Sequence, residues 1–205
     1  MNTSEKQTLY FGFRQVIYIV GCFAIISFQH LLAAKYLNET FHEHGVVENL
    51  QLGELLLTIA LFCTTAFRIK EFKRLAPLFA GLCALATCRE LDNFLGSTIP
   101  ILGWKIGFLF VLLTGTYALK HWQETRKEFF QFIRHPAFGI MLGAMLLILP
   151  IAQCVGHKSF IVHVLQEEHV GRIKELLEES IETIGYFLLF CSAIELLFTP
   201  QRQRK

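Results

Sequence analysis

The residues with the clearest chemical potential are carboxylates that lie inside apolar stretches of the sequence. A charged side chain at the centre of a bilayer costs roughly 2.5–3.5 kcal/mol even on the most lenient insertion scale. Several such carboxylates on different helices are therefore expected to face one another or water. The candidate residues for binding a metal cation or protons are Glu54, Glu90, Asp92, Glu179 and Glu182.

Helical spacing gathers these carboxylates on shared faces. Gln51 and Glu54 stand three residues apart, which is one helical face. Glu179, Glu182 and Tyr186 follow one another at i, i+3 and i+7, which forms a second continuous stripe. If the helices carrying them alternate in direction across a membrane, the stripes meet at one depth. The spacing therefore predicts an acidic chamber that opens to the outer side.

The charge of this chamber is unbalanced. The five candidate carboxylates outnumber the two nearby cations, Arg89 and Lys105. Excess carboxylates packed together bind a cation, hold protons or face water. A purely structural ion-pair network remains an alternative, because buried charges often pair for neutralisation alone. The residues expected to set the local charge or to support the site are Arg89, His30, Glu48, Lys105 and Tyr186.

Carboxylates and imidazoles are suitable ligands for divalent ions, so a divalent metal is the one cofactor that the composition permits. In the segment before residue 170, His163 and Glu167 stand four residues apart and could share a metal on a helix. The sequence has no HExxH, no GxSxG and no glycine-rich phosphate loop. Catalytic residues are therefore not identified.

The overall composition indicates the elements that hold these residues. The chain has 205 residues, of which 53% are hydrophobic, 20 are Phe and 18% are charged. Soluble domains carry about 25% charged residues, and the mean hydropathy here is +0.45. These values argue against a soluble enzyme. The net charge of +2 gives no indication of nucleic-acid binding.

The fold class expected is an all-α polytopic membrane protein with six transmembrane helices in a single domain, 1–205. A membrane helix needs about 20 mostly apolar residues. The six spans predicted from this length are 16–34, 50–67, 75–95, 99–119, 138–155 and 179–198.

The distribution of Lys and Arg predicts the orientation of these spans. Six spans place 13 of the 19 Lys and Arg residues on the side that holds both termini, the 68–74 loop and the 120–135 loop. Basic residues are enriched in cytoplasmic loops. Both termini are therefore expected in the cytoplasm, with the protein integral to the plasma or cytoplasmic membrane and the acidic chamber facing outward.

Two segments between the spans are expected to lie on the membrane surface. The 120–135 segment mixes basic and aromatic residues, which is typical of a helix anchored to anionic lipid headgroups. The 156–172 segment alternates apolar and charged residues and predicts an amphipathic helix that covers the chamber on the outer surface. The expected partners are the lipid bilayer and a cation or lipid ligand.

Three functions remain open at this point. The first is a binding or conduction role in which the acidic chamber holds a metal cation or protons. The second is a metal-dependent membrane hydrolase or transferase that acts on a lipid-borne group at the outer leaflet. The third is an accessory subunit of a membrane complex, in which the polar residues only join helices or dock a partner.

Overall fold

The computed structural model describes residues 3–40, 45–157 and 170–198. This part of the chain is almost wholly helical and contains no strand. The longer helices are α1 (Thr3–Thr40), α2 (Val46–Arg68), α3 (Leu75–Glu90), α5 (Gly107–Lys120), α7 (Pro136–Leu146) and α10 (Val170–Leu197). The shorter elements are η1 (Lys70–Phe72), α4 (Asp92–Thr98), η2 (Gly103–Ile106), α6 (Trp122–Ile133), η3 (Leu147–Ile151) and α8 (Ala152–Val155).

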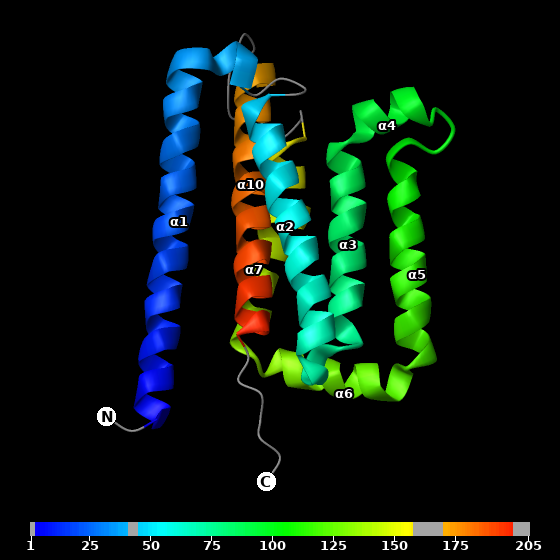
Figure 1. The fold of residues 1–205 in the computed structure, drawn as a ribbon. Helices are drawn as coiled ribbons and strands as arrows, with labels where there is room; N and C mark the ends of the chain where they lie inside the picture. The colour runs from blue at the N-terminus through cyan, green and yellow to red at the C-terminus, as the bar shows by residue number, and fades with distance from the viewer. Residues whose placement is uncertain (1–2, 41–44, 158–169, 199–205) are drawn as a thin grey trace.

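The longer helices run side by side in alternating directions, as Figure 1 shows. The short helix α4 lies at one end of the bundle and α6 lies across the other, so we call these the α4 end and the α6 end. Helix α10 has the central place, because it contacts α1, α2, α7, η3 and α8. Helix α5 stands at the edge and packs on α3.

Length and composition mark four helices as able to cross a membrane, over Thr8–Ala33, Val46–Arg68, Pro136–Val155 and Leu176–Leu197. A fifth candidate is the pair Asp92–Thr98 and Gly103–Lys120, whose two parts are bent by 93°. The predicted all-α fold is therefore confirmed for the described residues, and several of its helices are compatible with a membrane protein. In the described part of the chain, length and composition give four such helices, or five if the bent pair counts as one span, against the six spans predicted.

The third and fourth predicted spans differ from the helices observed. The third was expected over 75–95, but α3 ends at Glu90, where Leu91 leaves the helical conformation and the chain turns into α4. The fourth was expected from residue 99, but the chain makes a turn there and α5 begins at Gly107. Gly103 has a φ of +49°, a conformation that glycine adopts without steric cost, so this residue permits the turn.

The last helix is longer than expected. The sequence predicted a sixth span from residue 179, whereas α10 begins at Val170. Residues 170–172, which were expected to belong to a separate surface helix over 156–172, continue into α10 instead. The rest of that predicted helix, 158–169, lies outside the described residues, as do His163 and Glu167.

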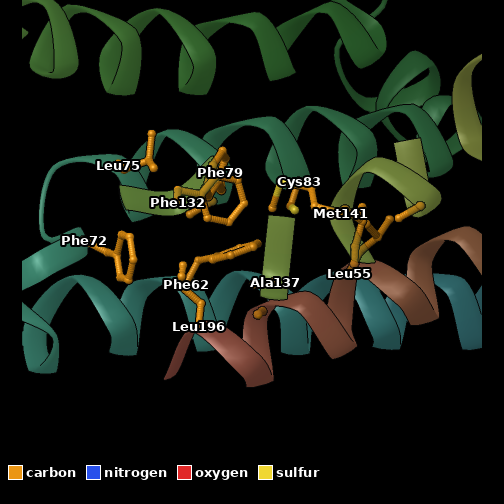
Figure 2. Packing of buried hydrophobic residues seen from close by; sticks show 14 of the residues in the cluster. Leu55, Phe62, Phe72, Leu75, Phe79, Cys83, Phe132, Ala137, Met141 and Leu196 are labelled. Atoms are coloured by element: carbon orange, nitrogen blue, oxygen red, sulfur yellow. The ribbon is translucent and has the colours of Figure 1, made fainter. Parts of the chain in front are cut away.

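The apolar core lies between the helices and combines aliphatic side chains with several aromatic rings, four of which are labelled in Figure 2. The ring centroids of Phe62 and Phe79 are 5.4 Å apart, and those of Phe79 and Phe132 are 4.9 Å apart. Phe132 belongs to α6, so this side chain ties the crossing helix to the bundle. Other large apolar side chains point outward, such as Phe67 at 91% exposure, as expected for a surface that meets lipid.

Candidate functional site

Helices α2 and α10 meet through polar side chains near the α4 end. The side chain of Gln51 is fully buried, and its Nε2 donates to Glu179 Oε2 at 2.8 Å and to Thr183 Oγ1 at 3.1 Å. Thr183 also donates to the backbone carbonyl of Glu179 at 2.7 Å. Buried polar groups are costly unless they are hydrogen-bonded, so these contacts fix the register of α2 against α10.

The last turn of α3 adds the cation of the site. Arg89 Nη2 donates to Glu182 Oε1 of α10, and the same nitrogen lies 3.6 Å from Glu90 Oε1. The hydroxyl of Tyr186 donates to Glu90 Oε1 at 2.6 Å. Glu182 and Tyr186 are 2% and 1% exposed, so the acidic side of the ion pair lies inside the bundle, whereas Arg89 reaches it from a partly exposed position.

We call these residues the carboxylate cluster. It consists of Gln51, Arg89, Glu90, Glu179, Glu182, Thr183 and Tyr186. The contacts around Gln51 and those around Arg89 are electrostatically connected, because the negative charges of Glu182 and Glu90 both act on Glu179. Three carboxylates and one guanidinium give the cluster two negative charges in excess if every group is ionised.

The opening of the cluster toward the α4 end carries further acids. The charges of Glu48 and Glu178 both act on Glu90. The carboxylate of Glu178 packs directly over Gly156, where a Cβ atom would lie 2.5 Å from its Cδ. Lys174 Nζ lies 3.7 Å from Glu178 Oε2 and offsets part of this negative charge.

The residues predicted for the site fall into two groups. Glu90, Glu179, Glu182, Arg89 and Tyr186 lie together in the cluster, and Glu48 lies at its opening. The others lie apart: Glu54 is one turn further along α2, and Asp92, His30 and Lys105 are exposed.

Asp92 and Lys105 lie apart because α3 ends before them. Asp92 is in α4, near Gly103, and Lys105 is in η2. His30 is separated for a different reason, since its side chain is on the exposed face of α1 while the neighbouring Gln29 is 3% exposed.

Glu54 occupies a separate apolar position deeper in the bundle. It is 9% exposed, and its Oε2 has no hydrogen-bond partner among the described residues. Its charge acts on Cys22 of α1 and on Cys191 of α10, so it lies where these three helices meet.

A second buried ion pair, near the α6 end, was not predicted from the sequence. Glu195 of α10 is 2% exposed and accepts hydrogen bonds from Arg14 and from the hydroxyl of Tyr18, both in α1. The signal was present, because Arg14 and Tyr18 stand four residues apart and Glu195 interrupts the apolar run after Glu182.

Two side chains, one in α6 and one just after it, cap the starts of α3 and α7. Glu128 Oε2 accepts from the backbone N–H groups of Arg74 and Leu75, each at 2.8 Å, at the start of α3. His135, between α6 and α7, accepts from Ala137 N through Nδ1 at 3.2 Å. Burial lowers the pKa of His135 below its usual 6.5, and the neutral ring is the form that accepts this bond. These contacts satisfy N–H groups that a helix start leaves unpaired.

Within the ranges 3–40, 45–157 and 170–198, no group of three or more His, Cys, Asp or Glu side chains is arranged to hold a metal ion. The cluster oxygens named above are each directed to a protein donor: Glu179 to Gln51, Glu90 to Tyr186, and Glu182 to Arg89.

Comparisons with protein-family models, with curated proteins and with solved structures give no match for the chain. The functional argument therefore rests on the geometry of the side chains.

Proposed function

We propose that the protein binds protons inside the membrane, in the carboxylate cluster at the α4 end. The observation that carries this proposal is that three carboxylates share one cation: Glu90 and Glu182 both lie beside Arg89, and their charges act in turn on Glu179, which Gln51 holds. Uncompensated charge in a low-dielectric interior is costly, and a carboxylate relieves that cost by taking up a proton. The cluster then changes its charge as protons enter and leave.

Neutral donors around the cluster support this role. Gln51 and Tyr186 each hydrogen-bond one carboxylate, so they keep the carboxylates in place in both protonation states. A bound metal ion would instead need several of these oxygens turned toward one point. Binding of a divalent metal, which the sequence also permitted, is therefore less well supported than binding of protons.

Glu54 is the second group we assign to this function. A bare anion at a position that is 9% exposed, with an unpartnered Oε2 among the described residues, would be strongly disfavoured. We infer that Glu54 carries a proton. It lies between the cluster and Glu195, because Cys191 of α10 is acted on by the charges of both Glu54 and Glu195.

The membrane arrangement that fits this function has six spans, formed by α1, α2, α3, η2 with α5, α7 to α8, and α10. We infer that the α6 end faces the cytoplasm and the α4 end faces outward. The sequence assigns 13 of the 19 Lys and Arg residues to the side that holds the 68–74 and 120–135 segments, and η1 and α6 of these segments pack together at the α6 end, which supports this orientation.

Infrared spectroscopy of the purified protein tests the proposal directly, because a protonated carboxyl group has its own C=O stretching band. We expect this band in the wild-type protein at neutral pH. It should decrease in Glu182→Gln, Glu179→Gln and Glu54→Gln, each of which removes one titratable group and keeps its shape. Glu124→Gln, at an exposed position on α6, is the matched control and should leave the band unchanged.

Two results would overturn the proposal. One is a wild-type spectrum without the band at neutral pH. The other is a stoichiometric transition metal in the purified protein that is lost in Glu182→Gln. The second result would establish metal binding in place of proton binding.

A further inference from the structure

A cavity of about 370 Å³ lies beside the carboxylate cluster, between α3, α7, η3 and α10. This volume is within the range of about 300–1,000 Å³ typical of small-molecule sites. Nearly all of its lining is apolar, and the central residues are Phe79, Cys83, Ala86, Met141, Met145 and Leu189. Figure 2 labels three of these, Phe79, Cys83 and Met141, among the side chains between the helices.

The cavity is elongated along the bundle. Its lining on α3 runs from Phe79 to Arg89, and these two residues are about 15 Å apart along the helix axis. Arg89 and Trp104 line it near the α4 end, and Phe62 and Phe79 line it toward the core. One end of the cavity is therefore polar and the rest is apolar. This distribution matches a lipid that has a polar head group and an acyl chain.

The cavity reaches the outer surface of the bundle through apolar side chains. Leu82 of α3 and Leu149 of η3 both line it, and they are 37% and 57% exposed. In a membrane that surface meets acyl chains, so a lipid enters sideways without crossing water.

A local distortion of the backbone shapes one wall. Residues Leu147–Ile151 form a π-helical turn that contains Pro150, and Ile148 and Leu149 of this turn line the cavity. Proline removes a backbone donor, and single π-helical turns occur frequently at functional sites. Gly185 of α10 lets the turn approach closely, because a Cβ atom there would collide with Ile148.

The charges next to the cavity determine which head group it accepts. Arg89 is the charged residue of the lining, and it is already paired with Glu182 and close to Glu90. An anionic head would lack a free counter-charge and would be repelled by the carboxylates behind Arg89. A cationic head would meet the guanidinium first. The remaining choice is an uncharged head whose oxygen accepts a hydrogen bond from Arg89.

We propose that this cavity binds the single acyl chain of an uncharged glycerolipid, with its hydroxylated head at Arg89 and Trp104. The cavity borders the carboxylate cluster and shares Arg89 and Tyr186 with it, but lipid binding rests on the lining and the opening of the cavity and does not require the cluster to bind protons.

The two tryptophans provide the test. Trp104 lines the cavity, whereas Trp122 is on α6 and is 58% exposed. Each is kept alone, in Trp122→Phe and Trp104→Phe respectively. Purified protein in detergent is titrated with a monoacylglycerol carrying bromines on its chain, which quench a tryptophan in contact with them. We expect saturable quenching of Trp104 and only weak, non-saturating quenching of Trp122.

A variant that fills the cavity makes the test specific. Ala86→Leu places three more carbons in the cavity, where they displace methylene groups of the acyl chain. The Kd for the lipid, measured by the quenching of Trp104, should therefore rise by about tenfold. Ala60→Leu, at an exposed position on α2, is the matched control and should leave the titration unchanged.

Brominated fatty acid and brominated phosphatidylcholine complete the comparison. Both should bind less tightly than the monoacylglycerol, so that quenching of Trp104 requires higher lipid concentrations. Stronger binding of the anionic fatty acid would overturn the charge argument. Equal quenching by all three lipids, with no effect of Ala86→Leu, would show ordinary contact with the bilayer and would overturn the site itself.

Discussion

Arg14 of α1 and Glu195 of α10 form a two-pronged ion pair across the bundle. Arg14 Nε lies 2.7 Å from Glu195 Oε1, and Nη2 lies 2.9 Å from Oε2. Planar pairing of this kind is stronger than a single charged hydrogen bond. The hydroxyl of Tyr18 donates to the same carboxylate at 2.8 Å, so the two side chains of α1 together hold this helix against α10.

Removing the cation of this pair should destabilise the fold. Arg14→Ala leaves Glu195 buried with Tyr18 as its remaining donor, and we expect a loss of about 3 kcal/mol in the free energy of unfolding. Arg14→Lys should recover only part of this, because lysine lacks the fork. Thermal unfolding of the purified protein measures both changes. Wild-type stability in Arg14→Ala would contradict the importance of the pair.

The pair between Arg89 and Glu182 should behave differently in a double variant. We expect Arg89→Ala to lose about 2–3 kcal/mol, less than a fully buried pair, since the Arg89 side chain is 39% exposed. Arg89→Gln combined with Glu182→Gln removes both charges and should be closer to the wild type than Arg89→Ala is. Denaturant unfolding of the three proteins checks the order, and a double variant weaker than Arg89→Ala would contradict it.

His135 should make stability fall in acid. Its pKa is lowered in the folded protein, so the unfolded chain binds more protons once the pH drops below about 6.5. The stability from His135 is full above that value and is lost as the pH falls toward the lowered pKa. His135→Asn keeps a side chain that caps helices but does not titrate.

The measurement compares the melting temperatures of wild type and His135→Asn from about pH 8 to about pH 5. Loss of a cap costs about 1 kcal/mol, which corresponds to roughly 2–4 °C for a protein of this size. As the pH falls over this range, we expect the melting temperature of the wild type to drop by roughly 2–4 °C more than that of His135→Asn. Parallel curves would show that the ring does not titrate with folding.

The proposed orientation predicts where reporter proteins end up. Fusions after Lys70, after Arg126 and at the C-terminus should report the cytoplasm. Fusions after Ser97 and after His157 should report the outer side, because these positions lie at the α4 end. A cytoplasmic signal after His157 would remove the six-span arrangement.

The part of the cluster that followed from the sequence is the part set by helical spacing. Glu179, Glu182 and Tyr186 share a face of α10, and Gln51 lies on the facing side of α2, as their positions predicted. Local spacing determines which residues of one helix lie together. The buried face and direction of each helix then determine which helices meet.

The parts that did not follow depend on where a helix ends and on which face it buries. Asp92 continues the pattern of α3 in the sequence, but the helix stops at Glu90, two residues earlier. His30 and Gln29 are neighbours on an apolar helix, and spacing alone does not tell which of them packs inward. The partnership of Arg14 with Glu195 joins residues 181 positions apart, and no local pattern connects them.

Helix α3 is short for the membrane it is proposed to cross. With 16 residues it extends about 24 Å, against a hydrocarbon thickness of roughly 30 Å. Helix α2, which packs against it, has 23 residues and extends about 35 Å. In the proposed arrangement these two neighbours therefore match bilayers of different thickness. We expect the lipids around α3 to thin locally to cover its apolar surface, so that this side of the bundle favours thin membrane regions and short-chain lipids.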